Sequence, residues 1–282
     1  MCELFGLSSS APTSVNLSLS RLAAHGGLTG PHRDGWGAAF YEDRDVRLIK
    51  EAEPAADSDW IRFLDHKTLR TPLAMAHIRL ATEGAPAYRN TQPFARELGG
   101  RMHLFAHNGW LPGIHSHPGM RATAFRPVGE TDSEFAFCVL LERLRGLWRD
   151  PVRAPSVSDR FAVVADFAAS MRTLGPANFL YADGDVLFAH GDRRKSSKTA
   201  KPEPPGLVVQ YRCCEHTQSA PDPSGLTIGK GDQHVALVAS VALSDEAWHP
   251  LGEGELIALQ SGRRIMSNSA APSREVIIKR QA

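Results

Sequence analysis

Short apolar runs typical of β-strands recur along both halves of this chain, and their distribution constrains the fold more than any other feature. Two adjacent amphipathic helices separate the early runs from the late ones. This grouping favours a single α+β domain of stacked sheets, spanning residues 1–282, over two separate domains. The predicted strands cover residues 2–8, 38–41, 46–50, 72–78, 102–107, 178–182, 186–189, 207–211, 235–241, 255–259, 263–266 and 275–278.

The helices are predicted from capping residues that precede apolar residues at helical spacing. Thr131, with Glu134 three positions later, forms a capping-box pattern and begins a helix that reaches residue 148. The other predicted helices cover residues 14–24, 57–64 and 158–172, and Asp57 is expected to cap the second of these.

Two segments interrupt this pattern and are expected to lie on the surface as excursions. Residues 191–206 are basic and contain proline, and residues 212–233 are polar and rich in turn residues. The basic segment has no aromatic residue, which argues against nucleic-acid binding. The net charge of +1 over 282 residues likewise gives no case for nucleic acid or an anionic membrane as partner.

The sequence predicts a cytoplasmic protein that needs neither a metal nor a cofactor. It has no apolar run of the roughly 20 residues that a membrane span requires, and no signal-peptide pattern at its start. Cys213 and Cys214 are adjacent, which is not the pattern of a disulfide framework. His115 and His117 lack a second pair of ligands at zinc-site spacing.

Cys2 follows the initiator methionine directly, and this position gives it two alternative roles. If Met1 is removed, Cys2 carries a thiol and a free α-amine, whose pKa of about 7.7–8.0 suits a base at neutral pH. One residue then supplies both nucleophile and base. The alternative is that Cys2 merely begins a buried strand.

Arg79 follows an apolar strand, where a guanidinium is costly unless it is paired. A ligand carboxylate would suit its two-pronged geometry, and a structural ion pair with Asp or Glu is the alternative. The glycine-rich segment 26–37 is predicted as a functional loop, since long connections of this kind usually carry function.

Two further positions each have a structural and a chemical interpretation. Asn108-Gly109 is typical of a tight hairpin turn, but an amide and a backbone N–H could equally stabilise a developing oxyanion. Asp132 lies in the first turn of a predicted helix. Its carboxylate could interact favourably with the positive end of the helix dipole, or it could bind a ligand.

Taken together, these positions resemble the class II glutamine amidotransferase (glutaminase) domain, in its stand-alone branch. The resemblance extends over about residues 2–260. It is carried by Cys2, by His32-Arg33 with Gly35 and Gly37, by His77-Ile78-Arg79 with Ala81-Thr82 and Gly84, by Asn108-Gly109, by Glu130-Thr131-Asp132-Ser133-Glu134 and by Leu243-Ser244-Asp245-Glu246.

The resemblance implies an N-terminal-nucleophile fold, an αββα sandwich of two antiparallel sheets. It implies that the Cys2 thiol attacks the γ-amide of glutamine, that Asn108 and Gly109 hold the oxyanion, and that water cleaves the resulting thioester. Arg79 would bind the substrate α-carboxylate and Asp132 the α-ammonium. Three further residues are implied with smaller roles: Thr82 and His77 in substrate binding, and Arg33 in positioning the N-terminus or closing the site.

Two departures from the family pattern leave several functions open. Leu80 replaces the tryptophan that often follows the arginine, and no nucleotide motif of a synthase is present. A stand-alone hydrolase of γ-glutamyl amides or dipeptides is favoured. The alternatives are a glutaminase subunit that supplies ammonia to a separate synthase, a non-catalytic binding relative, and an N-terminal-nucleophile hydrolase of bile-salt or penicillin-amidase type. A homo-oligomer also stays open.

Overall fold

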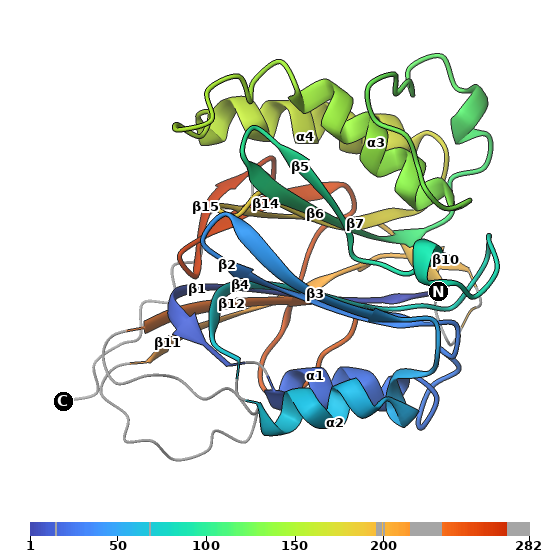
Figure 1. Ribbon diagram of the computed structural model, residues 1–282, viewed down its shortest axis with the longest axis vertical. Helices are drawn as coiled ribbons and strands as arrows, with labels where there is room; N and C mark the ends of the chain where they lie inside the picture. Colours follow the sequence, from blue (N-terminus) through green and yellow to red (C-terminus); the bar gives the residue numbers. More distant parts are fainter. Residues whose placement is uncertain (15, 68, 196–198, 200, 215–232, 270–282) are drawn as a thin grey trace.

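A computed structural model describes residues 1–14, 16–67, 69–195, 199, 201–214 and 233–269. The layers follow the order helices, sheet, sheet, helices, and both sheets are antiparallel (Figure 1). The αββα sandwich predicted from the resemblance is therefore confirmed.

The first sheet contains seven strands in the order β13-β11-β12-β1-β4-β2-β3. Strand β1 is paired along its length with β12 on one side and β4 on the other, so the N-terminal strand lies inside the sheet. The strands are β1 (Glu3–Thr13), β2 (Trp36–Glu42), β3 (Asp45–Glu51), β4 (Thr71–Ile78), β11 (Val208–Cys214), β12 (Gln233–Ala239) and β13 (His249–Pro250).

The second sheet contains six strands in the order β15-β14-β8-β7-β6-β5. Gly99 and Gly100 both have positive φ and form the tight connection between β5 and β6. The strands are β5 (Phe94–Leu98), β6 (Arg101–Gly109), β7 (Ala177–Ala182), β8 (Leu187–Gly191), β14 (Glu255–Gln260) and β15 (Arg263–Ser267). A separate hairpin joins β9 (Arg194–Lys195) to β10 (Pro202–Glu203).

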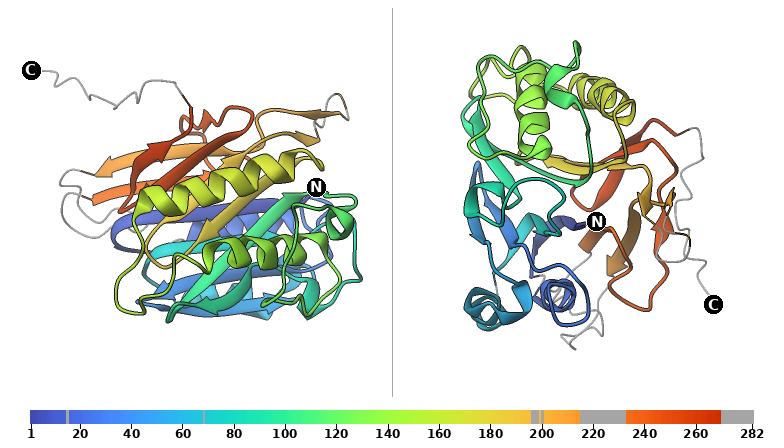
Figure 2. Two further views of the ribbon diagram at one scale, coloured as in Figure 1. Left: turned by 90° about the horizontal axis from the view of Figure 1, so that it is seen from above. Right: turned by 90° about the vertical axis from the view of Figure 1, so that its right-hand side faces the viewer.

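Helices α1 (Asn16–His25) and α2 (Asp59–His66) cover the seven-stranded sheet, and α3 (Asp132–Leu144) and α4 (Val157–Arg172) cover the other (Figures 1 and 2). Thr131 caps α3 as predicted, because its Oγ1 accepts the Glu134 N–H at 3.2 Å. The predicted cap of α2 is wrong by one residue. Ser58, not Asp57, accepts the N–H groups of that helix's first turn.

Alternation along the strands divides the interior into three apolar layers. Leu4 of β1 and Leu104 of β6 lie between the sheets, whereas Phe5 packs against α1 and α2. Phe105, the next residue of β6, lies with the largest layer, beneath α3 and α4. The same alternation directs the polar residues at the strand ends either between the sheets or toward the helices.

Three local predictions have different outcomes. Asn108-Gly109 is not a hairpin turn, because both residues extend β6 and pair with Asn178 and Ala177 of β7. The predicted strand 275–278 and nearly all of the predicted excursion 212–233 lie outside the described residues. Within the other predicted excursion, 191–206, the chain forms the β9–β10 hairpin.

We expect Phe105→Ala to lower the free energy of unfolding by about 3–5 kcal/mol, the usual cost of truncating a buried phenylalanine. Phe105 is 0% exposed, and its ring centroid lies 5.5 Å from those of both Phe137 and Phe179. Urea denaturation measures the change. Val152→Ala is the control, since Val152 is 74% exposed and its truncation should change stability by less than about 0.5 kcal/mol. A similar loss in both variants would contradict the assigned core.

Candidate active site

Cys2 lies immediately before β1, next to the N-terminus of the chain, which Figure 2 marks. Its Sγ contacts the backbone of Leu80, accepting the N–H at 3.3 Å and lying 3.4 Å from the carbonyl oxygen. Burial raises the pKa of the Cys2 thiol above its usual value, although the Leu80 backbone and the charges of the N-terminus and Arg79 act in the opposite direction. A buried thiol of this kind needs a base before it can act as a nucleophile.

The residue before Cys2 is held by a chain of hydrogen bonds. The Met1 carbonyl oxygen lies 2.7 Å from Nε2 of His32, and Nδ1 of His32 lies 3.2 Å from the His25 carbonyl oxygen. The His25 ring in turn contacts the Glu3 carboxylate at 2.7 Å. This chain places His32 beside the Met1–Cys2 peptide bond, a position that the sequence analysis did not assign to it.

Arg33, which the sequence analysis did select, occupies a different place. Its side chain is exposed, and its Nη2 donates a 2.7 Å hydrogen bond to the carbonyl of Gly27. Arg33 therefore ties together the glycine-rich loop, while the preceding His32 reaches the N-terminus.

Asn108 lies at the end of β6 with its side chain fully buried (0% exposed). Its Nδ2 donates to Ser240 Oγ at 3.4 Å, and its Oδ1 has no partner among the described residues. Ser240 Oγ also accepts the Leu4 N–H at 3.0 Å. Ser240 thus links the Asn108 amide to the strand that begins after Cys2. No local pattern in the sequence singles out this serine.

The backbone around Asn108 and Gly109 is fixed from β7. Asn178 Nδ2 donates to the Asn108 carbonyl at 3.0 Å and to the Arg193 carbonyl at 2.8 Å. A Cβ at Gly109 would lie 1.8 Å from the Pro176 carbonyl oxygen, so only glycine fits there. Gly109 therefore owes its residue type to close packing at a strand end rather than to a turn.

Arg79 is only 3% exposed, and its guanidinium lies inside the loop that follows it. Nη2 donates to the carbonyls of Glu83 and Gly84, and Nη1 to those of Ala85 and Asp34, at distances of 2.7 to 3.3 Å. The alternative of a structural ion pair is not formed by Arg79 among the described residues. Its hydrogen bonds go to uncharged carbonyls, the charges of Asp34 and Glu130 act on it from nearby, and its own charge acts on the Cys2 thiol.

Thr82 belongs to the same loop, and its side chain is exposed. The loop is also anchored at Ala81, whose N–H donates to the Asp34 carboxylate at 2.7 Å. The structure therefore brings Thr82 and Arg79 into one short loop beside the Cys2 thiol.

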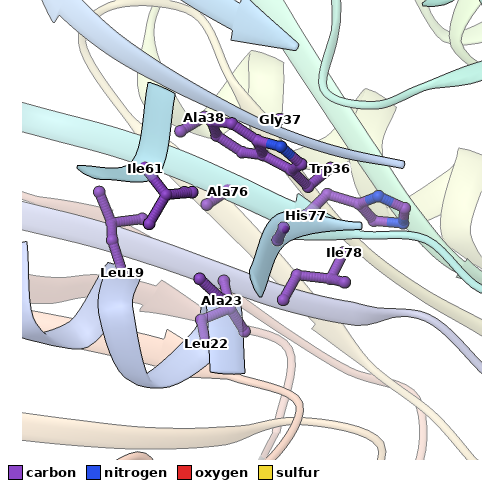
Figure 3. A pocket seen from close by; sticks show the side chains of 11 residues that line it. Leu19, Leu22, Ala23, Trp36, Gly37, Ala38, Ile61, Ala76, His77 and Ile78 are labelled. Carbon is purple, nitrogen blue, oxygen red and sulfur yellow. The ribbon is translucent and has the colours of Figure 1, made fainter. Parts of the chain in front are cut away.

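His77 is fully buried (0% exposed), and neither ring nitrogen has a hydrogen-bond partner among the described residues. Its ring points away from Leu19 and Ile78, which line a small apolar pocket between the sheet and the helices (Figure 3). Burial, together with the charges of Arg79, His107 and His32, lowers the pKa of His77 to about 3. His77 is therefore a neutral ring at physiological pH, with unused hydrogen-bonding capacity.

Asp132 begins α3, and its carboxylate is almost fully engaged by backbone donors. Oδ2 accepts the Leu111 N–H at 2.8 Å, and Oδ1 accepts the Ser133 N–H at 2.7 Å. The Ser133 hydroxyl in turn lies 2.9 Å from Nδ1 of His107. Asp132 thus fixes the segment that follows Gly109.

No group of three or more metal-ligating side chains occurs among the described residues. Within the same part of the chain, no helix is both long and apolar enough to cross a membrane.

Two antiparallel sheets between helix layers, with a cysteine at the start of an inner strand, are the arrangement of N-terminal-nucleophile hydrolases. A family model for class II glutamine amidotransferases matches residues 1–281. The chain belongs to this family, which confirms the resemblance inferred from its motifs.

Individual relatives agree with this family. "Putative glutamine amidotransferase YafJ" from Escherichia coli (strain K12) is 41% identical over 190 residues, which are 67% of this chain and 72% of YafJ. A solved structure described as a predicted glutamine amidotransferase from Pseudomonas aeruginosa PA01 is 32% identical, with a TM-score of 0.66. It covers 94% of this chain and 100% of its own.

A more distant solved structure shares the fold alone. Glutamine phosphoribosylpyrophosphate amidotransferase from B. subtilis is 17% identical, with a TM-score of 0.58, and the match covers 94% of this chain but only 48% of that one.

The Glu3–His25 pair predicts a pH-dependent contribution to stability. The hydrogen bond that the His25 ring donates to Glu3 raises the pKa of His25, so this stabilisation is complete below about pH 6.5 and is lost as the pH rises through the higher folded value. Burial opposes the fall in the pKa of Glu3, but the bond to His25 and its charge outweigh it. The contribution of Glu3 is therefore lost at acidic pH.

We expect Glu3→Gln to destabilise the protein by about 0.5–1 kcal/mol more at pH 6 than at pH 9, as measured by urea denaturation. Glu42→Gln is the control, because Glu42 pairs with an arginine, Arg47, and not with a histidine. An equal cost of Glu3→Gln at both pH values would mean that the His25 charge contributes nothing.

Proposed function

We propose that the protein, after removal of Met1, is an amidohydrolase that cleaves the γ-amide of glutamine or of a γ-glutamyl compound through the Cys2 thiol. The observation that carries this proposal is the placement of Cys2. Its thiol sits at the start of an inner strand, and Ser240 joins that strand to the Asn108 amide. A single side chain thus connects the Asn108 amide to the strand that begins directly after Cys2.

In the proposed reaction, the Cys2 α-amine takes the thiol proton while sulfur attacks the γ-carbonyl carbon. The raised pKa of the buried thiol makes such a base necessary, and an α-amine with a pKa of about 7.7–8.0 can provide it at neutral pH. The amine then protonates the leaving nitrogen as the C–N bond breaks. Water cleaves the γ-glutamyl thioester, which releases glutamate and restores the thiol.

Asn108 Nδ2 and the Gly109 N–H are the proposed donors to the tetrahedral oxyanion. The amide of Asn108 has a second hydrogen besides the one directed at Ser240, and the close packing of Gly109 holds the backbone rigidly beside it. Preorganised donors of this kind are worth about 10²–10³ in rate each.

Recognition of the substrate α-amino acid group is proposed for Arg79 and Asp132, which supply one cation and one anion. The substrate carboxylate would take over donors that Arg79 now directs at the carbonyls of Glu83 and Gly84. Thr82, exposed in that loop, and the neutral ring of His77 add polar groups to the same region. Arg33 is proposed only to hold the glycine-rich loop.

A stand-alone hydrolase is the favoured form of this activity. The second candidate is a glutaminase subunit that supplies ammonia to a separate synthase. Membership of the amidotransferase family supports this candidate, since amide transfer requires an acceptor. Strict preference for glutamine over γ-glutamyl peptides would favour the second form.

We expect the processed protein to form a single covalent adduct with the glutamine-analogue electrophile 6-diazo-5-oxo-norleucine. Intact mass would show loss of Met1 and one adduct, and peptide mapping would place it on Cys2. Cys2→Ala should take no adduct. Cys138→Ala, the matched control, should react normally, because Cys138 is buried and burial raises its pKa to about 11. A processed protein without an adduct would overturn the proposed function.

We expect Asn108→Ala to lower kcat by about 10²–10³ with little change in KM, because the lost donor acts on the transition state. Steady-state hydrolysis of glutamine measures both constants. Asn268→Ala is the control, since this exposed asparagine bonds the backbone of Leu256 and Gly254 far along the chain. A rise in KM at constant kcat would instead assign Asn108 to substrate binding.

A further inference from the structure

The position of the leaving nitrogen follows from the proposed function, on which this inference rests. The Cys2 α-amine must protonate that nitrogen, so the two lie within hydrogen-bond reach of each other in the reaction. In the structure, the group bonded to the Cys2 nitrogen is Met1. Removal of Met1 therefore opens the space in which the leaving amine is released.

Different cations act on the Cys2 thiol and on the amine of the preceding residue. The Arg79 charge acts on the thiol, on the side assigned to the glutamyl group. The charges of Arg194 and Lys195, in β9, act on the Met1 amine, where burial has the larger effect in lowering the pKa. In Figure 1 the label of β10 lies at the same end of the sandwich as the N-terminus. Arg194 and Lys195 are thus cations whose charge reaches Met1, and Arg194 is placed near the first strand by its bond to the Ser240 carbonyl.

Arg194 is fixed in this position from two directions. Its Nη1 donates a 2.5 Å hydrogen bond to the carbonyl of Ser240, whose N–H pairs with the Leu4 carbonyl at 3.0 Å. The backbone just before it is held by Asn178, which also bonds the carbonyl of Asn108. The Arg194 guanidinium therefore belongs to the hydrogen-bond network around the proposed oxyanion donors, and its position is fixed by that network.

The charge of Arg194 has no carboxylate paired with it in the described part of the chain. Glu3 is the acidic group that acts on it, and the Glu3 carboxylate already bonds His25. The preceding Arg193, by contrast, forms ion pairs with Asp192 and Glu253. A half-buried guanidinium without a counter-ion is costly, and an anionic ligand would remove that cost.

We propose that the leaving amine is an amino acid or a short peptide, and that its carboxylate pairs with Arg194, with Lys195 as a second cation at the rim. Ammonia, which is the leaving group from glutamine, has no carboxylate that could bind these two cations. The substrate class is then a γ-glutamyl amino acid or peptide. The thioester bond forms as the C–N bond breaks, the α-amine supplies the proton to the leaving amine, and water releases glutamate.

The test compares a γ-glutamyl dipeptide with the same compound carrying a C-terminal carboxamide, for which γ-glutamyl-alanine and γ-glutamyl-alaninamide are the probes. We expect the processed wild type to prefer the free acid by about 10-fold or more in kcat/KM, as a charge-assisted bond requires. Arg194→Gln should abolish this preference, so that the ratio of kcat/KM between the free acid and the carboxamide falls to about 1. Formation of the Cys2 adduct with 6-diazo-5-oxo-norleucine shows that the variant is folded.

Arg193→Gln is the matched control, since its guanidinium is already paired, and it should keep the preference for the free acid. Equal wild-type rates on both compounds, or an equal loss on both in Arg194→Gln, would overturn the assignment of Arg194. Adduct formation at Cys2 with hydrolysis of glutamine alone would also overturn it, while the proposed nucleophile stands. If the processed protein formed no adduct, this result would contradict the proposed function itself.

Discussion

The pairing of β1 on both sides is the constraint on which the rest of the site depends. Residues after Cys2 are bonded to β12 and β4 along one strand, and alternation directs Leu4 between the sheets and Phe5 toward the helices. A one-residue slip would exchange these two layers, so the register is strongly fixed. The N-terminus of the chain, normally its least ordered part, is therefore held in place by the core.

The buried polar side chains around this strand differ in how many of their hydrogen-bonding groups have a partner. Asp132 and Asn178 have bonds to backbone groups on every side, whereas Asn108 Oδ1 and both ring nitrogens of His77 have none among the described residues. Buried polar groups without partners are costly, and proteins keep them chiefly where a ligand or water completes them. These unused groups lie in the space between the sheets and next to it, where the proposed reaction takes place.

Local signals in the sequence predicted much of the fold and some of the site. The cap at Thr131 and most strands are confirmed because capping and alternation act over a few residues. Asn108-Gly109 misleads as a turn, since the dipeptide is selected here by packing against β7. His32 and Ser240 could not be found in this way. Their partners, Met1 and Leu4, are contacts of the folded chain that no spacing reveals.

The charges around Cys2 set the kind of substrate the site can accept. Carbonyl oxygens satisfy the hydrogen bonds of Arg79 but carry no net charge. Among the described residues, Arg194 bonds one carbonyl, and Glu3 is the acidic group whose charge acts on it. Glu3 in turn is engaged by His25. Removal of Met1 moves the free α-amine to Cys2 and adds no negative charge. Under the proposal, the cations that act on the thiol and on the N-terminus favour a substrate with a carboxylate on each side of its scissile amide over glutamine, which has only one.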